Sequence, residues 1–416
     1  MKKLVAFILV LALLCSVAVL SLAQDEQTLT VWYSGNVNGK AATRAAETYE
    51  AAHPGVKINI EMVATSDRET RLTVALTSGD MTGLPDITLF QDYSAQKFLQ
   101  FFPGCFVDLS KALNMADFTQ EKVGYWTSGD GVYALPFDSG ASALFVRLDY
   151  LEAAGYSLSD LENITWDEYI DIGKKVQEAT GKYMLTETDY TNLTMAMVKS
   201  AGRWYFEDDG TVNLTKNEAV IETVKTIQKL HDAGIVMENG DWASFVASLN
   251  NGDAASVATG NWILGSIVGA ADQSGKWGMA PMPALSKSTG HYGSAGGSSW
   301  AVLSSSKQQE LAVDYLKEFL TDDFNTYLIS ELATVPSYLP AQKLPCASEP
   351  YAFTAGQAVF ADIMRYAQNT PVIAYGPYNA EVTTAMANVN AEVIGGKDLT
   401  QALQDAQDNL VFLMEK

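Results

Sequence analysis

Strand-like and helix-like segments alternate near the start of the chain, and this alternation is the strongest constraint on its fold. Residues 29–33, 56–62 and 85–90 are rich in β-branched and aromatic side chains, as strands are. Residues 40–52 and 68–76, which separate them, have the apolar spacing of helices. Strands that alternate with helices of this length form right-handed βαβ units around a parallel sheet. The sequence therefore predicts an α/β fold.

The loops that follow the first and third of these strands are where we expect a ligand. Ligands of open parallel sheets bind beyond the carboxyl ends of the strands. Residues 34–38 follow the first strand, and residues 91–94 follow the third. Both loops carry polar side chains, so both are candidate parts of a binding site.

The first 23 residues have the layout of a secretory signal peptide. Two lysines precede an apolar run over residues 4–20, and Ser21 and Ala23 are small residues two positions apart. We therefore predict that residues 1–23 are a signal peptide and that the protein is exported to the periplasm or the outer face of the cell membrane. A membrane anchor is the alternative, because the apolar run is nearly long enough to span a bilayer.

The charge of the chain excludes some partners. The 416 residues include 27 basic and 49 acidic side chains, which gives a net charge of −22. Loss of the two leader lysines changes this balance to 25 minus 49, or −24. An acidic protein lacks the basic surface with which nucleic acids and anionic membranes are bound, so neither is an expected partner. The length predicts two domains or one large domain.

The cysteines and histidines are few. Cys15 lies within the leader, and Cys105 and Cys346 remain in the exported chain. Two cysteines can pair in an oxidising compartment, and the sequence leaves open whether these form a disulfide or remain separate thiols. The three histidines do not cluster with cysteines, so we predict no metal site and no cofactor.

Several short segments, taken together, resemble the extracellular solute-binding proteins of ABC importers, in the maltose-binding type that serves sugars. Each segment is weak evidence alone, but their order and spacing extend over nearly the whole exported chain. One departure is Val146-Arg147, where many relatives carry Tyr-Asn. The segments are residues 29–32, 83–87, 133–138, 144–147, 153–155, 165–169, 251–255, 260–262, 278–283 and 296–302.

The resemblance implies a two-lobed periplasmic-binding-protein fold of type II. Each lobe would contain a mostly parallel sheet flanked by helices, with the ligand cleft at the hinge. We place crossings between the lobes near Asp138, near Gly296 and at residues 334–336. The predicted lobes are residues 24–138 plus 296–333 for the N-terminal lobe and 139–295 plus 334–416 for the C-terminal lobe.

The resemblance also implies a function. The protein, as a monomer, would capture a mono- or oligosaccharide. It would deliver this sugar to the transmembrane subunits of an ABC permease by hinge closure. A polyol or another small neutral solute is an alternative ligand. A secreted carbohydrate-active enzyme and a sugar sensor for a membrane receptor are alternative functions. The sequence has no nucleophile elbow and no P-loop, so we predict no catalytic residues.

The chemistry of a sugar indicates which residues would bind it. A pyranose has an apolar ring face, which aromatic side chains cover, and a rim of hydroxyls, which carboxylates and amides bind. Trp262 follows a strand where the resembling proteins place a stacking tryptophan, although a core position is the alternative. Asp138 matches a cleft carboxylate of relatives, although it could equally cap a turn. The candidate ligand-binding residues are Trp32, Ser34, Asn36, Asp92, Tyr93, Asp138, Tyr190, Trp262, Gly297, Trp300 and Tyr378.

Overall fold

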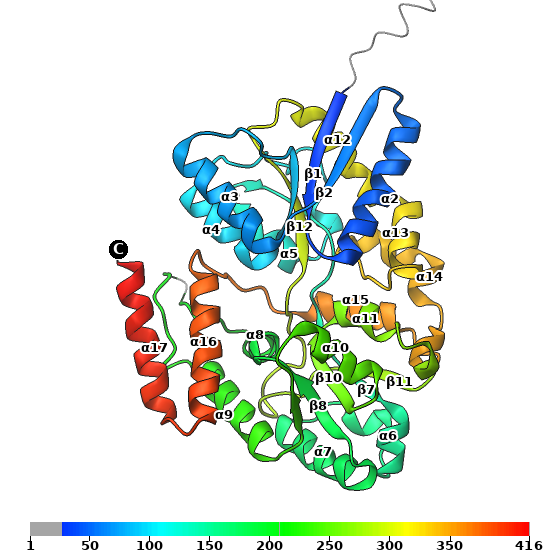
Figure 1. The fold of residues 1–416 in the computed structure, drawn as a ribbon, viewed down its shortest axis with the longest axis vertical. Helices are drawn as coiled ribbons and strands as arrows, with labels where there is room; N and C mark the ends of the chain where they lie inside the picture. Colours follow the sequence, from blue (N-terminus) through cyan, green and yellow to red (C-terminus); the bar gives the residue numbers. More distant parts are fainter. Residues whose placement is uncertain (1–26, 208, 416) are drawn as a thin grey trace, which may run out of the picture.

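Two five-stranded sheets organise the protein, one above the other in Figure 1. The computed structural model describes residues 27–207 and 209–415, so the predicted signal peptide and Cys15 lie outside the described residues. The first sheet has the order β2-β1-β3-β12-β6, and the second has the order β11-β7-β10-β8-β9. The predicted two-lobed α/β fold is therefore confirmed.

The first sheet begins with the predicted βαβ units. Strand β1 pairs in parallel with both β2 and β3, whereas β12 pairs antiparallel with β3 and β6. The sheet is therefore mixed, with its antiparallel part next to the junction between the lobes. Its strands are β1 (Gln27–Tyr33), β2 (Val56–Met62), β3 (Ile87–Gln91), β6 (Leu135–Pro136) and β12 (Ser298–Val302). Its helices are α2 (Asn36–Ala52), α3 (Thr65–Ser78), α4 (Ala95–Phe101), α5 (Gln120–Tyr125), α12 (Gln309–Leu316) and α13 (Asp322–Ser330).

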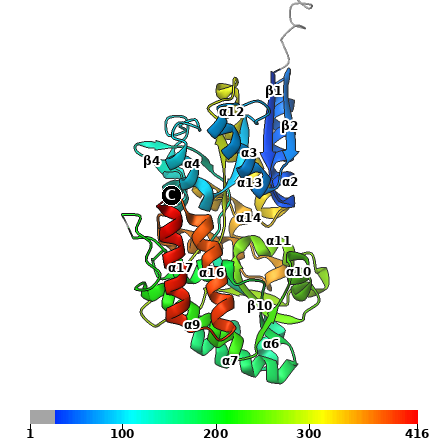
Figure 2. The same cartoon turned by 60° about the vertical axis from the view of Figure 1, so that its left-hand side comes forward.

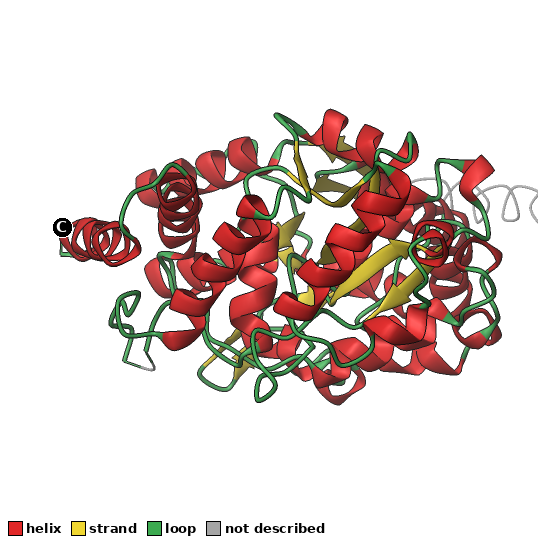
Figure 3. Cartoon of the chain, turned by 90° about the horizontal axis from the view of Figure 1, so that it is seen from below, coloured by secondary structure: helices red, strands yellow, loops and turns green. Residues whose placement is uncertain are grey.

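The second sheet is also mixed. Figure 3 shows helices around the strands of the protein. Strand β8 pairs in parallel with β9 and β10, and β7 pairs antiparallel with β10 and β11. Its strands are β7 (Ser142–Arg147), β8 (Tyr183–Glu187), β9 (Val236–Glu238), β10 (Ala254–Gly260) and β11 (Trp277–Ala280). Its helices include α6 (Leu148–Ala153), α7 (Trp166–Thr180), α8 (Thr191–Ser200), α9 (Glu218–Asp232), α10 (Trp242–Asn250) and α11 (Leu264–Ile267).

A hairpin of β4 (Thr127–Ser128) and β5 (Gly131–Val132) lies in the N-terminal half of the chain.

The C-terminal part of the chain is helical. Helices α16 and α17 lie side by side and pack on α9 (Figure 2). The C-terminal helices are α14 (Pro345–Ser348), α15 (Val359–Asn369), α16 (Asn379–Ile394) and α17 (Leu399–Met414).

Helix α7 shows how local sequence sets element boundaries. Thr165 caps its first turn: the Thr165 hydroxyl accepts a hydrogen bond from the backbone N–H of Glu168, whose carboxylate accepts one from the Thr165 backbone N–H. The helix ends at Gly181, which has a φ of 69° in the left-handed region that favours glycine. Both boundaries were predicted from the sequence.

Three extended segments cross between the two sheets and are hydrogen-bonded to one another. The backbone N–H of Ala295 donates to the Gly140 carbonyl at 2.9 Å, which joins the first crossing to the second. The backbone N–H of Ser139 donates to the Val335 carbonyl at 2.8 Å, which adds the third. A Cβ at Gly140 would lie only 2.3 Å from the Gly296 carbonyl oxygen, so these backbones approach too closely for any side chain.

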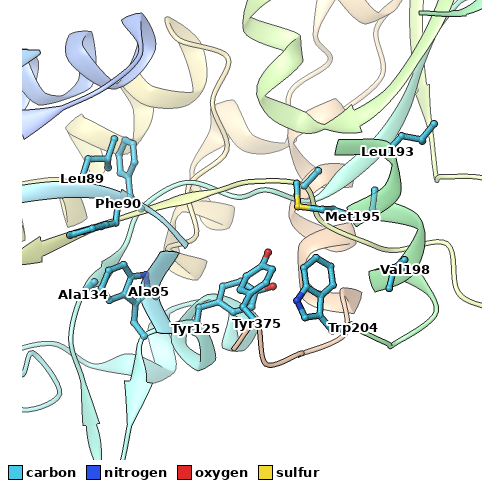
Figure 4. Packing of buried hydrophobic residues seen from close by; sticks show 14 of the residues in the cluster. Leu89, Phe90, Ala95, Tyr125, Ala134, Leu193, Met195, Val198, Trp204 and Tyr375 are labelled. Carbon is cyan, nitrogen blue, oxygen red and sulfur yellow. The ribbon is translucent and has the colours of Figure 1, made fainter. Parts of the chain in front are cut away.

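The largest hydrophobic core is continuous from one lobe to the other. Figure 4 shows the aromatic rings that connect them: Tyr125 lies on the side of the first sheet, Tyr375 lies next to it, and Trp204 lies beyond Tyr375. The ring centroids of Tyr125 and Tyr375 are 4.6 Å apart, and those of Trp204 and Tyr375 are 5.0 Å apart. Aromatic packing is therefore continuous across the junction between the lobes.

The close approach at Gly140 generates a stability prediction. Gly140→Ala should lower the free energy of unfolding by roughly 1–3 kcal/mol, because the new methyl group overlaps the backbone of the second crossing. Gly240→Ala is the matched control, because a Cβ there would meet no described atom within 4 Å. Equilibrium urea unfolding measures both variants, and equal stabilities would contradict the account of the crossing.

Candidate functional site

The carboxyl ends of the parallel strands in both sheets lie toward the junction. The first turn of α2, which follows β1, approaches the helix that follows β10: a Cβ at Gly265 would lie 4.0 Å from the Val37 side chain. The turn after β3 (Asp92–Ser94) likewise contacts α16. The segments that follow β1 and β3 of the first sheet therefore lie against helices of the second lobe.

A pair of tryptophans lies at the edge of the second sheet. Trp262 is half-buried in a turn after β10, and its indole Nε1 donates to the Ala295 carbonyl oxygen at 2.8 Å. The ring of Trp242, which begins α10, lies 5.5 Å from the Trp262 ring, and Trp242 is 51% exposed. Trp242 was not among the predicted residues, although the sequence does place this aromatic directly after Asp241, a residue type that caps helices. Together the rings offer apolar area for a sugar face.

The edge of the first sheet carries a buried arginine that the sequence analysis also missed. Arg68 is 0% exposed, and its Nη1 donates to the Ser34 hydroxyl at 3.2 Å. Among the described residues its Nε and Nη2 have no hydrogen-bond partner, and burial lowers the pKa of Arg68 to about 10. The sequence does contain a sign of this site: Arg68 shares the apolar face of α3 with Leu72 and Ala75, where an arginine is unexpected.

Tyr93 lies beside Arg68 at the end of β3. Its side chain is half-buried, and burial together with the nearby Glu69 carboxylate raises the pKa of Tyr93 to about 12. Glu69 is in turn held by the Ser94 hydroxyl, which donates to it at 2.5 Å. Arg68 therefore lies next to two of the predicted residues, Ser34 and Tyr93.

The two predicted carboxylates, Asp92 and Asp138, bond to other parts of the protein. Asp92 is fully buried: it accepts hydrogen bonds from Trp126 Nε1 at 2.9 Å and the Ser299 hydroxyl at 2.6 Å, and forms an ion pair with Lys122. Asp138 Oδ1 accepts from both the backbone N–H and the hydroxyl of Ser298 at 2.6 Å. Burial is the main cause of the raised pKa of Asp138. Both side chains fix the junction.

Gly297 belongs to the same junction. Its φ is 91°, and a Cβ there would lie 2.6 Å from Lys122 Nζ and 3.0 Å from an oxygen of Asp92. A side chain would therefore disrupt the buried ion pair. The close approach at Gly297 is therefore to this ion pair.

Three predicted aromatic residues are buried in the lobes. Trp300 is fully buried with its ring packed near Phe137, and Trp32 donates from Nε1 to Glu61 at 2.9 Å. Tyr190 is buried, and its hydroxyl donates to Glu238 at 2.6 Å. All three side chains are covered by other parts of the protein.

Asn36 and Tyr378 are the remaining predicted residues. Asn36 is exposed and lines a separate surface hollow of about 440 Å³ along α2, together with Arg44 and Tyr327. Tyr378 is half-buried, and its ring lies 5.5 Å from Phe101 of α4, so it connects the two lobes. Neither lies with the tryptophan pair in any contact of the described chain.

Glu187 is a third residue that the sequence analysis missed. It ends β8, it is 3% exposed, and its Oε1 has no hydrogen-bond partner among residues 27–207 and 209–415. Burial raises the pKa of Glu187 to about 8, so its carboxyl is largely protonated at neutral pH. A protonated carboxyl can donate a hydrogen bond as well as accept one.

The described part of the chain contains two cysteines, and neither forms a disulfide. Cys105 is a buried free thiol, and Cys346 is a half-buried free thiol, which settles the alternative left open by the sequence. No group of His, Cys, Asp or Glu side chains in the described ranges could hold a metal ion.

Comparison with known proteins identifies the family. The family described as bacterial extracellular solute-binding protein matches residues 44–361. A lactose-binding protein of Rhizobium radiobacter is 35% identical over 401 residues, which cover 95% of this chain and 94% of that protein. An arabinooligosaccharide-binding protein of Bacillus subtilis strain 168 is 26% identical over 76% of each chain. The chain therefore belongs to the bacterial extracellular solute-binding proteins, as its sequence resemblance predicted.

The fold has well-matched solved relatives. The GacH receptor of Streptomyces glaucescens, solved unliganded and with acarbose, matches with a TM-score of 0.79 at 18% identity, over 94% of this chain and 99% of that one. Between residues 27 and 415, no helix has the length and apolar character needed to cross a membrane.

The buried Glu187 generates a pH prediction. Its folded pKa of about 8 lies above the ordinary glutamate value of 4.5, so its contribution to stability is complete below about pH 4.5 and is lost as the pH rises through 8. Between pH 5 and 8, the wild type should lose on the order of 3 kcal/mol of unfolding free energy relative to Glu187→Gln.

Denaturant unfolding at several pH values measures this difference. Glu178→Gln, which changes an exposed carboxyl on α7, is the control and should keep the wild-type pH profile. Parallel profiles for Glu187→Gln and the wild type would show that the Glu187 carboxyl is not buried as described.

Proposed function

We propose that this protein is the substrate-binding component of an ABC importer, which captures a carbohydrate between its lobes and delivers it to the membrane permease by hinge closure. The observation that carries the proposal is Trp262, an indole anchored through Nε1 at the edge of the second sheet, with the exposed Trp242 beside it. Carbohydrates are bound through such aromatic faces. The lactose- and arabinooligosaccharide-binding relatives support a sugar ligand.

The proposed site draws on both lobes. Trp262 and Trp242 would cover the apolar face of a sugar ring, while Arg68, Tyr93 and Glu187 would bind its hydroxyls. Arg68 and Glu187 are suited to this role because each has a buried polar atom that no described residue satisfies. Asp92, Asp138 and Gly297 would act through the junction and not through the ligand.

Closure would be a hinge motion of the two lobes, whose residue boundaries would be those predicted from the sequence. A ligand can favour the closed form only by binding it better than the open form. Contacts from both sheet edges supply that difference, because they can be made together only when the lobes close. The protein would act as a monomer in the periplasm or at the outer face of the cell membrane, with the transmembrane permease subunits as partners.

We further propose that the protein does not convert its ligand. The relatives that match it are named as binding proteins. Incubation with a sugar panel tests this directly, and any catalytic product would overturn it.

A thermal-shift screen tests the ligand class. The panel should contain lactose, arabino-oligosaccharides and malto-oligosaccharides, with peptides, polyamines and polyols as controls. A sugar at 100 times its dissociation constant should stabilise the protein by about 2.7 kcal/mol. A shift with peptides, polyamines or polyols, and with no sugar, would contradict the carbohydrate proposal.

Two tryptophan variants separate binding from folding. Trp262→Ala should weaken sugar binding by roughly thirtyfold, or about 2 kcal/mol, with the fold retained. Trp300→Ala should instead lower stability by about 3–5 kcal/mol, because that indole is fully buried. Calorimetric titration and thermal melts measure both quantities. Unfolding of Trp262→Ala, or sugar binding unchanged by it, would remove Trp262 from the site.

A further inference from the structure

A lysine from one lobe and a glutamate from the other meet in the buried junction. Lys199 lies on α8 of the second lobe and is 0% exposed, and Glu121 lies on α5 and is 4% exposed. Lys199 Nζ is 3.5 Å from Glu121 Oε1. Helix α5 belongs to the first lobe, because the ring of Trp126, at its end, packs 5.5 Å from Phe90 of β3.

The pair is completed by hydroxyl groups from two further segments. Lys199 Nζ donates to the Tyr375 hydroxyl at 2.5 Å and to the Ser294 hydroxyl. Ser294, on the second crossing, in turn donates to Glu121 at 2.5 Å. The Tyr125 hydroxyl also donates to Glu121. The full set of hydrogen bonds around the pair therefore requires both lobes and the crossing together.

The surroundings make this pair sensitive to separation. The ammonium lies 4.6 Å from the ring centroid of Tyr375 and 5.1 Å from that of Tyr125, so it is shielded from water by aromatic rings. Asp92 and Lys122 are the other charged side chains that influence it. Burial lowers the pKa of Lys199 to about 8, against the opposing attraction of Glu121. A buried charge that loses its partner is strongly destabilised, whereas a neutral pair in the same place is tolerated.

We propose that Lys199 and Glu121 form a charge latch between the lobes: the closed form tolerates these two charges only as a pair, so loss of either one weakens ligand binding although neither touches the ligand. The inference rests on the proposed hinge closure. Opening would part α5 from α8 and expose both charges to water, so an unpaired charge would be costly only when the lobes are closed. Lys199 and Glu121 are thus positioning residues.

A double-variant cycle tests the latch in the full exported chain. Lys199→Met and Glu121→Gln should each raise the dissociation constant for lactose at least tenfold, because each leaves one charge buried without its partner in the closed form. The double variant removes both charges and should return to within about threefold of the wild type. Tyr375→Phe, which removes one acceptor of Lys199, should weaken binding less than either charge variant.

Small-angle X-ray scattering provides a readout that needs no ligand. Each single-charge variant should have a larger radius of gyration than the wild type, and the double variant should match the wild type. This readout tests the latch even if lactose and the other sugars fail to bind, which would overturn the proposed function alone. Lys229→Met is the control, because its ion pair with Asp167 is exposed and lies within the second lobe.

The outcomes separate the latch from its alternatives. Wild-type affinity and radius in both single variants would overturn it. A double variant that binds at least as weakly as the single variants would show that these side chains contact the ligand instead. Single variants that lose the fold, judged by thermal melts, leave Tyr375→Phe and the double variant to decide by the same two criteria.

Discussion

Two consecutive residues of α5, Glu121 and Lys122, hold the junction on which the rest of the structure depends. Lys122 pairs with Asp92 and donates to the Ser298 carbonyl at 3.0 Å, so it joins β12 to the end of β3 within the first lobe. Glu121 meets Lys199 of the second lobe. Because all these charges are buried, each needs its partner in place, and the register of the crossings is fixed as a result. Gly140 and Gly297 let the backbones approach closely enough for this.

This junction also determines what is left for a ligand. The carboxylates of Asp92 and Asp138 are engaged by serines, Trp126 and Lys122, so they support the crossings. Other side chains still have unsatisfied hydrogen-bonding atoms or free aromatic surface. Arg68 and Glu187 have unsatisfied polar atoms, and Trp262 with Trp242 has aromatic area. The division is physically sensible, since the hydrogen-bonded crossings must stay intact in every conformation, whereas a binding group must be free to exchange partners.

Local signals in the sequence predicted the architecture well. The βαβ order of the first strands and the capping of α7 by Thr165 depend on residues close together in the chain. The crossings were placed from the family resemblance, and they pair over long separations, as Asp138 does with Pro336. The roles of individual site residues depend on distant contacts. Asp92 follows a strand as a ligand residue would, but its partners come from 30 and 207 residues away. Trp262 and Trp300 are both tryptophans in or next to a strand, so the sequence does not separate their roles. Only packing in the fold makes the Trp262 indole half-buried and the Trp300 indole fully buried.

The central claim is that a sugar is held where the carboxyl edges of the two sheets meet. A crystal structure of the complex with the sugar that gives the largest thermal shift tests it most directly. The account predicts a sugar ring whose apolar face lies on Trp262, with hydroxyls hydrogen-bonded to groups of both lobes, Arg68 and Glu187 among them. A sugar bound elsewhere, for example in the groove of about 540 Å³ between α16 and α17, would contradict the account.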